Sequence, residues 1–218
     1  MERLYALIFM LLGWFTVIGQ YVVGHAHTVA GTIDYFSYFT ILSNILVAAT
    51  FTAAAVAPDA RAGRLLLRPT VAMATAVYIT VTGLTFYFLL SSLYALEGWT
   101  KHFDHLLHYV MPPAFVLFWL LFVPKGTLHL RNVPWMMVPP LLYGAWTLVH
   151  GAIADWYPYP FVDVSKLGYP RVLLHIVEFV FIFAFAGVIY VFLDRVIHHL
   201  GIQSHGDPRT ARPGASGP

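Results

Sequence analysis

The sequence predicts an all-α integral membrane protein with six transmembrane helices in one bundle. Of its 218 residues, 59% are hydrophobic and only 10% are charged, whereas a soluble domain carries about 25% charged residues. Six apolar segments have roughly the 20-residue length that a helix needs to cross a bilayer. The linkers between these segments are short, which favours antiparallel neighbours in a single bundle.

The six segments make up one transmembrane domain over residues 1–200. The first begins at Leu4 and ends without a small-residue cleavage pattern, so we expect a spanning helix there and not a signal peptide. Residues 201–218 are rich in Gly, Pro, Ser and Arg and are predicted to form a disordered cytoplasmic tail. The predicted helices cover residues 4–23, 35–57, 70–94, 105–123, 134–154 and 171–193.

The second helix, predicted to begin at Tyr35, carries a polar face near its start. Thr40, Ser43 and Asn44 are spaced i, i+3 and i+4, so they lie on one side of the helix. From a start at residue 35, Thr40 would lie about 8–9 Å below the outer end of the helix. A threonine in a membrane helix often bonds only its own backbone, and Ser43 and Asn44 could equally well bond between helices.

The third helix is rich in threonine and is expected to serve packing, whereas the fourth carries titratable groups. His105 and His108 share one face near its predicted start. Pro112 and Pro113 remove backbone hydrogen bonds to His108 and Tyr109, which predicts a kink beside the histidine.

The fifth and sixth helices add polar groups at the same depth. His150 lies near the outer end of the fifth, in which Pro139-Pro140 predicts a second kink nearer the middle. The sixth carries His175 and Glu178 on one face. Buried ionisable groups in a membrane mark functional sites, so this layer of polar side chains indicates chemistry. Seven histidines cluster at this end of the segments: His25, His27, His102, His105, His108, His150 and His175.

The distribution of Lys and Arg predicts the orientation. If the N-terminus is cytoplasmic, nine of the twelve basic residues lie on the cytoplasmic side and three on the other. Both termini are then cytoplasmic, and the histidine layer faces the outside. The cytoplasmic set is Arg3, Arg61, Arg64, Arg68, Lys125, Arg131, Arg195, Arg209 and Arg212, and the outer set is Lys101, Lys166 and Arg171.

Composition also excludes several classes of function. The net charge of +2 is too small to indicate a nucleic-acid partner. Because the chain contains no cysteine, it has no disulfide, no thiolate nucleophile and no zinc ribbon. No oligomeric state is predicted.

Short strings in this chain, taken in order, resemble one known family. They are Phe39-Thr40-Ile41, His105-x-x-His108 followed by Pro113, His150 leading through Trp156 to Tyr159-Pro160-Phe161, and Gly168-x-x-Arg171. The chain resembles the androgen-inducible family of six-helix membrane threonine hydrolases, which includes the androgen-dependent regulator of tissue factor pathway inhibitor, and in particular its bacterial six-span branch.

The resemblance implies a function and a pair of residues. Animal members hydrolyse fatty acid esters of hydroxy fatty acids with a threonine nucleophile and a histidine, both inside the membrane. The matching positions are Thr40 and His108, and Asp104 stands where the animal proteins have asparagine. The resemblance therefore implies an intramembrane lipid ester hydrolase, multi-pass in a bacterial plasma membrane, with a membrane lipid as substrate and no cofactor.

The chemistry of these residues fits that reading. A threonine hydroxyl is a weak nucleophile until a base takes its proton, and neutral His108 could be that base. Since Thr40 and His108 lie at similar depth, we expect their side chains within reach of a hydrogen bond or one water. Asn44 could donate to an oxyanion. The expected supporting or substrate-binding residues are Ser43, Asn44, Asp104, His105, His150, His175 and Glu178.

Two other classes of function remain open from the sequence. The histidines could ligate a metal ion or a haem on facing helices. The chain could instead be a non-enzymatic transporter or membrane scaffold, although no pair of broken helices in matching halves is evident.

Overall fold

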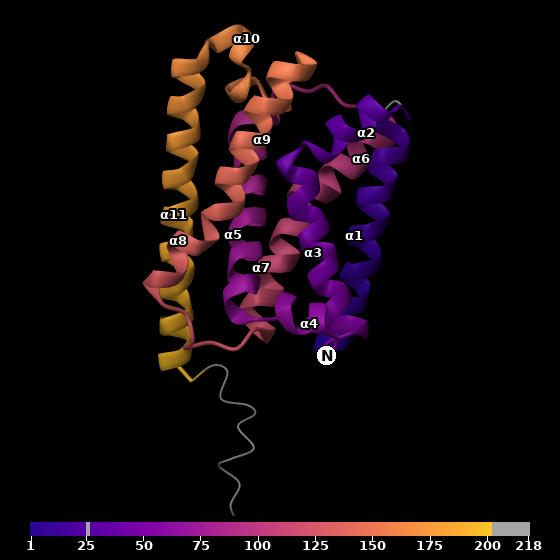
Figure 1. Cartoon of the computed structure of the whole chain (residues 1–218). Helices are drawn as coiled ribbons and strands as arrows, with labels where there is room; N and C mark the ends of the chain where they lie inside the picture. The colour runs from indigo at the N-terminus through magenta and orange to yellow at the C-terminus, as the bar shows by residue number, and fades with distance from the viewer. Residues whose placement is uncertain (25–26, 202–218) are drawn as a thin grey trace, which may run out of the picture.

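A computed structural model describes residues 1–24 and 27–201, and its helices confirm the predicted fold class. Six helical segments are long and apolar enough to cross a membrane, and no β-strand occurs in the described residues. His25 and the predicted tail beyond Gly201 lie outside the described part. Figure 1 shows the N-terminus and the end of the last helix at the same end of the bundle, as an even number of spans requires.

The elements follow one another in the order of the predicted segments. The first half contains α1 (Glu2–Gly24), α2 (Val29–Phe36), α3 (Phe39–Val56), α4 (Arg61–Leu66), α5 (Pro69–Thr85) and the π-helical turn η1 (Phe86–Leu90). The second half contains α6 (Gly98–His105), the π-helical turn η2 (Leu106–Val110), α7 (Met111–Phe122), η3 (Leu130–Asn132), α8 (Val133–Met136), α9 (Val138–Ala154), η4 (Pro160–Val162), α10 (Val164–Leu167) and α11 (Tyr169–His199).

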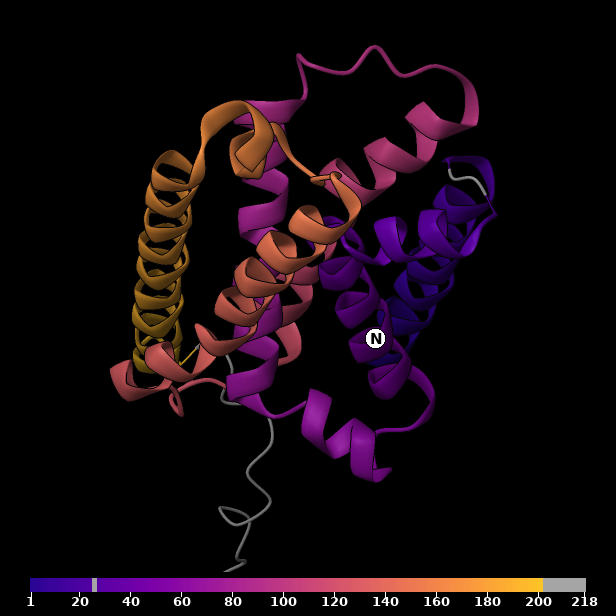
Figure 2. The same ribbon diagram turned by 45° about the horizontal axis from the view of Figure 1, so that its top comes forward.

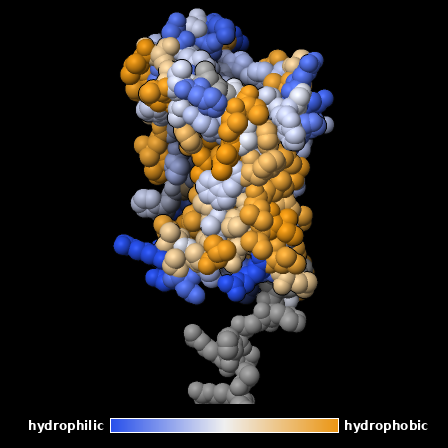
Figure 3. Space-filling model, turned by 90° about the vertical axis from the view of Figure 1, so that its right-hand side faces the viewer, coloured by the Kyte–Doolittle hydropathy of each residue, from blue (hydrophilic) through white to orange (hydrophobic). Residues whose placement is uncertain are grey.

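The exposed side chains form the apolar belt expected of a membrane protein. On the face that carries α1, Figure 3 shows a hydrophobic zone between hydrophilic ends. Leu4, Leu11 and Phe15 of α1 and Phe181 and Phe185 of α11 are among the large exposed apolar side chains. Exposed apolar side chains are unfavourable in water but not in contact with lipid hydrocarbon, so this belt matches a lipid-facing surface.

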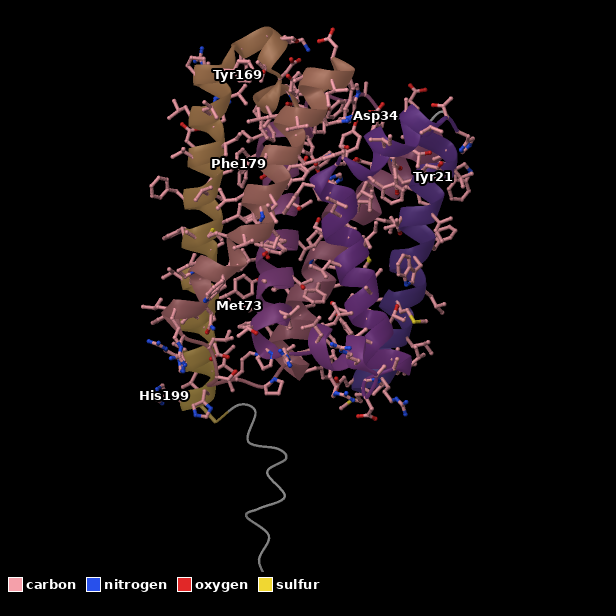
Figure 4. The ribbon with its side chains drawn as sticks, in the orientation of Figure 1. Tyr21, Asp34, Met73, Tyr169, Phe179 and His199 are labelled. Atoms are coloured by element: carbon pink, nitrogen blue, oxygen red, sulfur yellow. The ribbon has the colours of Figure 1, made fainter. Side chains whose placement is uncertain are left out.

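The helices differ in how far they are buried, and this places α3 and α5 at the centre. In α3, 61% of the residues in the apolar membrane-spanning stretch are buried, against 22% in both α1 and α11. Around these helices, Phe51, Phe115 and Trp119 are completely buried together with Met73. Figure 4 shows Met73 towards the end of the bundle where the termini lie, so this packed core leaves the opposite end of α3 for polar groups.

The second span begins later than the sequence predicts. Residues 29–36 form the separate short helix α2, and α3 starts at Phe39. Two residues of α9 bind Ser37 at this break. Tyr143 donates to the Ser37 carbonyl oxygen at 2.9 Å, and Trp146 donates to Ser37 Oγ at 3.0 Å. Thr40 therefore lies in the first turn of α3, not one to two turns below its start.

The predicted kink beside His108 is instead a π-helical turn. The Met111 N–H bonds to the Leu106 carbonyl five residues back, and Pro112 and Pro113 then open α7. A π turn accommodates an extra residue where prolines cannot continue the α-helical pattern. A second π turn, η1, ends the third span, whose predicted end at residue 94 is too late.

The remaining boundaries also differ from the prediction. The fifth span is interrupted at Met137, between α8 and α9, and Pro139 and Pro140 lie in the first turn of α9. The expected interruption therefore lies nearer the start of the span than the sequence predicts. A proline at the start of a helix removes an N–H that has no partner within the helix in any case. The fourth span starts at Gly98, and α11 extends to His199.

Single cysteines test the predicted orientation. Ala62 and Ala95 are both exposed, at opposite ends of the bundle, and the parent chain has no cysteine to give a background. We expect an impermeant maleimide added to intact cells to label Ala95→Cys and not Ala62→Cys, because the basic residues place residue 62 in the cytoplasm. Labelling of both variants after lysis is the control, and labelling of Ala62→Cys alone in intact cells would invert the topology.

Candidate functional site

Thr40 lies in the first turn of α3, with 7% of its surface exposed. Its Oγ1 lies 3.3 Å from Nε2 of His108, which projects from the π turn η2. The predicted approach of these two side chains is therefore confirmed. The two residues belong to different spans. Thr40 lies where the α-helix α3 begins, and His108 lies where the α-helical pattern of the fourth span is interrupted.

His108 is oriented by the residue four positions earlier. Its Nδ1 lies 2.9 Å from the Asp104 main-chain oxygen and 3.2 Å from Asp104 Oδ1. Both of these atoms are acceptors, so Nδ1 carries the proton and Nε2 presents a lone pair to Thr40. The ring of Phe86, from η1, stacks on the imidazole with a centroid distance of 3.7 Å and an interplanar angle of 12°.

Tyr159 completes the surroundings of the Thr40 hydroxyl and was not assigned a role from the sequence. Its phenol oxygen lies 3.3 Å from Thr40 Oγ1 and accepts the Thr40 N–H at 3.2 Å. Burial raises the pKa of Tyr159, which keeps the phenol protonated. Tyr159 lies in a connecting segment far from Thr40 in the chain, so helical spacing gave no sign of it. The string Tyr159-Pro160-Phe161 was the one feature of the sequence that singled out this residue.

Ser43 and Asn44 brace the main chain around Thr40. Ser43 Oγ donates to the Thr40 carbonyl oxygen at 3.1 Å and also meets Thr82 Oγ1 at 3.1 Å. Asn44 Nδ2 donates to the carbonyl oxygens of Thr40 at 2.9 Å and of Leu107 at 3.3 Å. The expectation that Asn44 donates to an oxyanion is therefore wrong, since both of its amide hydrogens already serve the backbone.

Two cavities of different polarity meet at Thr40. One is lined mostly by apolar groups of α5, α9 and α11 and has a volume of about 720 Å³ with its mouth. The other, of about 830 Å³ with its mouth, is lined by Asp104, His108 and residues of the segment between η1 and α6. Figure 2 shows that segment arching over one end of the bundle. Three residues, Thr40, Leu90 and Tyr159, line both cavities.

Six of the nine predicted site residues line neither cavity. Ser43 and Asn44 still bond the main chain beside Thr40, whereas the other four lie apart from it. His105 and Glu178 are exposed on their helices, and the His105 ring contacts Tyr109. His175 Nδ1 donates to the Phe161 carbonyl oxygen at 2.7 Å and so anchors η4 to α11. Glu178 makes no described ion pair with His175, although the two residues are three apart.

His150 forms a separate pair at the end of the bundle opposite the N-terminus. Its Nε2 lies 2.9 Å from Oδ1 of Asp34 in α2, and its ring stacks on Trp146 at 5.5 Å. Figure 4 shows Asp34 on the side of α2 that faces α9. This pair holds the short helix α2 against α9, next to the contacts that capture Ser37. Sequence reasoning missed Asp34 because a lone acidic residue between two apolar runs carries no spacing signal.

The histidines do not assemble into a metal centre in the described residues, where no three His, Asp or Glu side chains are placed to hold one ion. Comparison with known proteins adds no assignment. No family model, curated protein or solved structure matches the chain.

Asn44→Leu tests the bracing of Thr40. The change keeps a side chain of similar size but removes two hydrogen bonds to buried carbonyls, so we expect a loss of about 1–2 kcal/mol in stability. The matched control is Thr50→Val in the same helix, because Thr50 Oγ1 bonds only the Leu46 carbonyl of α3 itself. Thermal unfolding in detergent would measure both variants, and equal unfolding temperatures would contradict the bracing role.

Proposed function

We propose that this protein is an intramembrane ester hydrolase in which Thr40 is the nucleophile and His108 the general base. The observation that carries the proposal is the 3.3 Å contact between Thr40 Oγ1 and His108 Nε2, with Asp104 holding Nδ1 on the far side of the ring. Nucleophile, base and orienting acceptor in one line are the arrangement that acyl-transfer enzymes use.

The acylation step follows from this line of groups. Thr40 Oγ1 attacks the ester carbonyl carbon while its proton moves to His108 Nε2. Asp104 stabilises the imidazolium that forms, because its carboxylate oxygen lies 3.2 Å from Nδ1. When the tetrahedral intermediate collapses, the bond to the alcohol oxygen breaks and His108 returns the proton to that oxygen. The products of this step are the free alcohol and an acyl-Thr40 ester.

Deacylation uses the same groups in reverse. A water molecule in the polar cavity gives its proton to His108 Nε2 and attacks the acyl carbon. The bond to Thr40 Oγ1 breaks, Oγ1 regains the proton, and a carboxylic acid is released. Because His108 and Asp104 line the polar cavity, water can reach the base without crossing the apolar core.

Tyr159 supplies a donor for the oxyanion. Its hydroxyl lies 3.3 Å from Thr40 Oγ1. The Thr40 N–H, which has no helical partner in the first turn of α3, donates to the phenol oxygen at 3.2 Å and holds it in place. The N-terminus of α3 also favours negative charge. The Tyr159 hydroxyl thus takes the role expected of Asn44, whose amide hydrogens both bond backbone carbonyls.

The substrate class follows from the setting and from the family resemblance. The site is buried within six apolar spans, so a lipid ester can reach it more readily than a water-soluble ester can. The strings around Thr40, His108 and Tyr159 resemble the androgen-inducible hydrolases, which makes fatty acid esters of hydroxy fatty acids the first substrates to test.

A fluorophosphonate probe tests the nucleophile. We expect mass spectrometry of the labelled, purified protein to place the adduct on Thr40 and Thr40→Ala to abolish both labelling and ester hydrolysis. His108→Ala should slow hydrolysis on the order of 10²-fold or more, since it removes the base. Thr75→Ala is the control, because Thr75 is buried but bonds only the Val71 carbonyl of its own helix. Undiminished hydrolysis by a folded Thr40→Ala protein would refute the assignment.

Tyr159→Phe tests the oxyanion donor separately from the nucleophile. The ring stays in place, so we expect KM to change little while kcat falls on the order of 10²-fold. Tyr78→Phe is the control, since the Tyr78 hydroxyl donates to the Met136 carbonyl and not to the site. If Tyr159→Phe raised KM and left kcat unchanged, the phenol would serve substrate binding and not the transition state.

A further inference from the structure

The apolar cavity has the form of a binding site for a hydrocarbon chain. It extends from Thr40 along α9 between Pro140 and Thr147 and along α11 between Ile176 and Phe183. Seven residues of a helix rise about 10 Å, so the cavity runs about that far along the bundle. Figure 4 shows Phe179 pointing from α11 into the space towards α9.

Apart from Thr40 and Tyr159, four hydroxyl-bearing residues line the wall, and the hydroxyls of all but Thr85 bond protein groups. Thr82 Oγ1 bonds Ser43, Thr147 Oγ1 donates to the Tyr143 carbonyl oxygen, and Tyr143 OH donates to the Ser37 carbonyl oxygen. Each of these groups is satisfied without a ligand. Away from Thr40 and Tyr159, the wall therefore favours hydrocarbon over a polar headgroup.

The position of the general base decides which end of an ester enters this cavity. His108 lines only the polar cavity, and the base must return its proton to the leaving alcohol oxygen. The alcohol part of the substrate therefore lies on the polar side of Thr40. The acyl carbon bonded to Thr40 then has its chain on the opposite side, where the apolar cavity begins.

We infer that the cavity between α5, α9 and α11 binds the fatty acyl chain of the substrate and limits its length, while the polar cavity receives the alcohol part. This inference rests on the proposed hydrolase function. It deepens that function because it assigns each half of the ester to a different space on either side of Thr40.

Gly144 is the place where this inference can be tested by filling space. It lies in the wall between α9 and α11, where a Cβ would meet Ile176 Cγ2 at 3.6 Å, an ordinary contact. Alanine therefore fits, whereas leucine or phenylalanine must project into the cavity or displace Ile176. The neighbouring Ala145 is exposed on the same helix and does not line the cavity, so Ala145→Leu is a matched control.

Hydrolysis of p-nitrophenyl butyrate, octanoate and palmitate gives the first readout. We expect Gly144→Leu to lower kcat/KM for palmitate on the order of 10-fold or more relative to butyrate, because a filled cavity excludes the far end of a long chain. Gly144→Ala should have a smaller effect, and Ala145→Leu should keep the parent's chain-length profile. Equal losses for all three esters in a folded Gly144→Leu protein would overturn the length-limiting role.

Photocrosslinking with a diazirine-bearing palmitic acid gives a second readout that needs no turnover. In a Thr40→Ala background we expect adducts on cavity residues such as Tyr143 and Phe179, and their loss in Thr40→Ala/Gly144→Phe. Adducts only on lipid-facing residues such as Phe181 and Phe185, which are 70% and 69% exposed, would show annular lipid and overturn the inference.

The two readouts separate failure of this inference from failure of the proposed function. Cavity adducts that Gly144→Phe removes, without ester hydrolysis by the parent, would support the acyl site and reject the hydrolase. Hydrolysis that depends on Thr40, with crosslinks outside the cavity and an unchanged chain-length profile in Gly144→Leu, would support the hydrolase and reject the acyl site.

Discussion

Backbone polar groups inside a bilayer must find partners within the protein, and the region around Thr40 is organised by this constraint. The chain breaks at Ser37 and turns through π-helical segments at residues 86–90 and 106–110, so several carbonyl and N–H groups lose their usual α-helical partners. Side chains from other parts of the chain satisfy them. Tyr159 accepts the Thr40 N–H, Asn44 donates to the Leu107 carbonyl oxygen, and Tyr143 donates to that of Ser37.

Close packing of the main chain accompanies these polar contacts. A Cβ at Gly83 would lie 3.2 Å from the His108 carbonyl oxygen, so the absence of a side chain there lets α5 approach η2 closely. The same approach brings Phe86 flat against the imidazole of His108. The position of the histidine is thus determined by a proline-induced π turn on one side and by a glycine and an aromatic ring on the other.

The sequence was sufficient for the number of spans, which follows from composition. It was also sufficient for the Thr40–His108 contact, which was expected from the family resemblance and from the similar depth of the two residues. It was not sufficient for what depends on distant partners. The break before Phe39 is caused by Tyr143 and Trp146, which lie more than 100 positions away. Helical periodicity does not reveal such contacts, so the predicted start of the second span was wrong. The predicted position of Thr40 one to two turns inside that helix was wrong with it. Glu178 and His175 share a helical face, but in the structure His175 bonds the Phe161 carbonyl oxygen whereas Glu178 is exposed.

Tyr159 is a second residue whose place in the site depends on distant contacts. It lies in the segment after α9, which has no helical periodicity, and the packing of that segment against α3 brings its hydroxyl to Thr40. The polar helix faces pointed to Thr40 and His108, whereas Tyr159, which lies beside them, belongs to a connecting segment. Connections are where binding and catalytic residues concentrate, but a sequence pattern does not indicate which spans they will reach.

In the proposed hydrolase, the three residues shared by both cavities have a consequence for the fate of the products. With Thr40, Leu90 and Tyr159 as the partition, the proposed reaction would take place at a boundary between an apolar and a polar space. The alcohol would leave into the polar cavity, whereas the fragment with the hydrocarbon chain would stay in the apolar one. Hydrolysis at such a boundary would separate its two products, and this separation would oppose the reverse reaction.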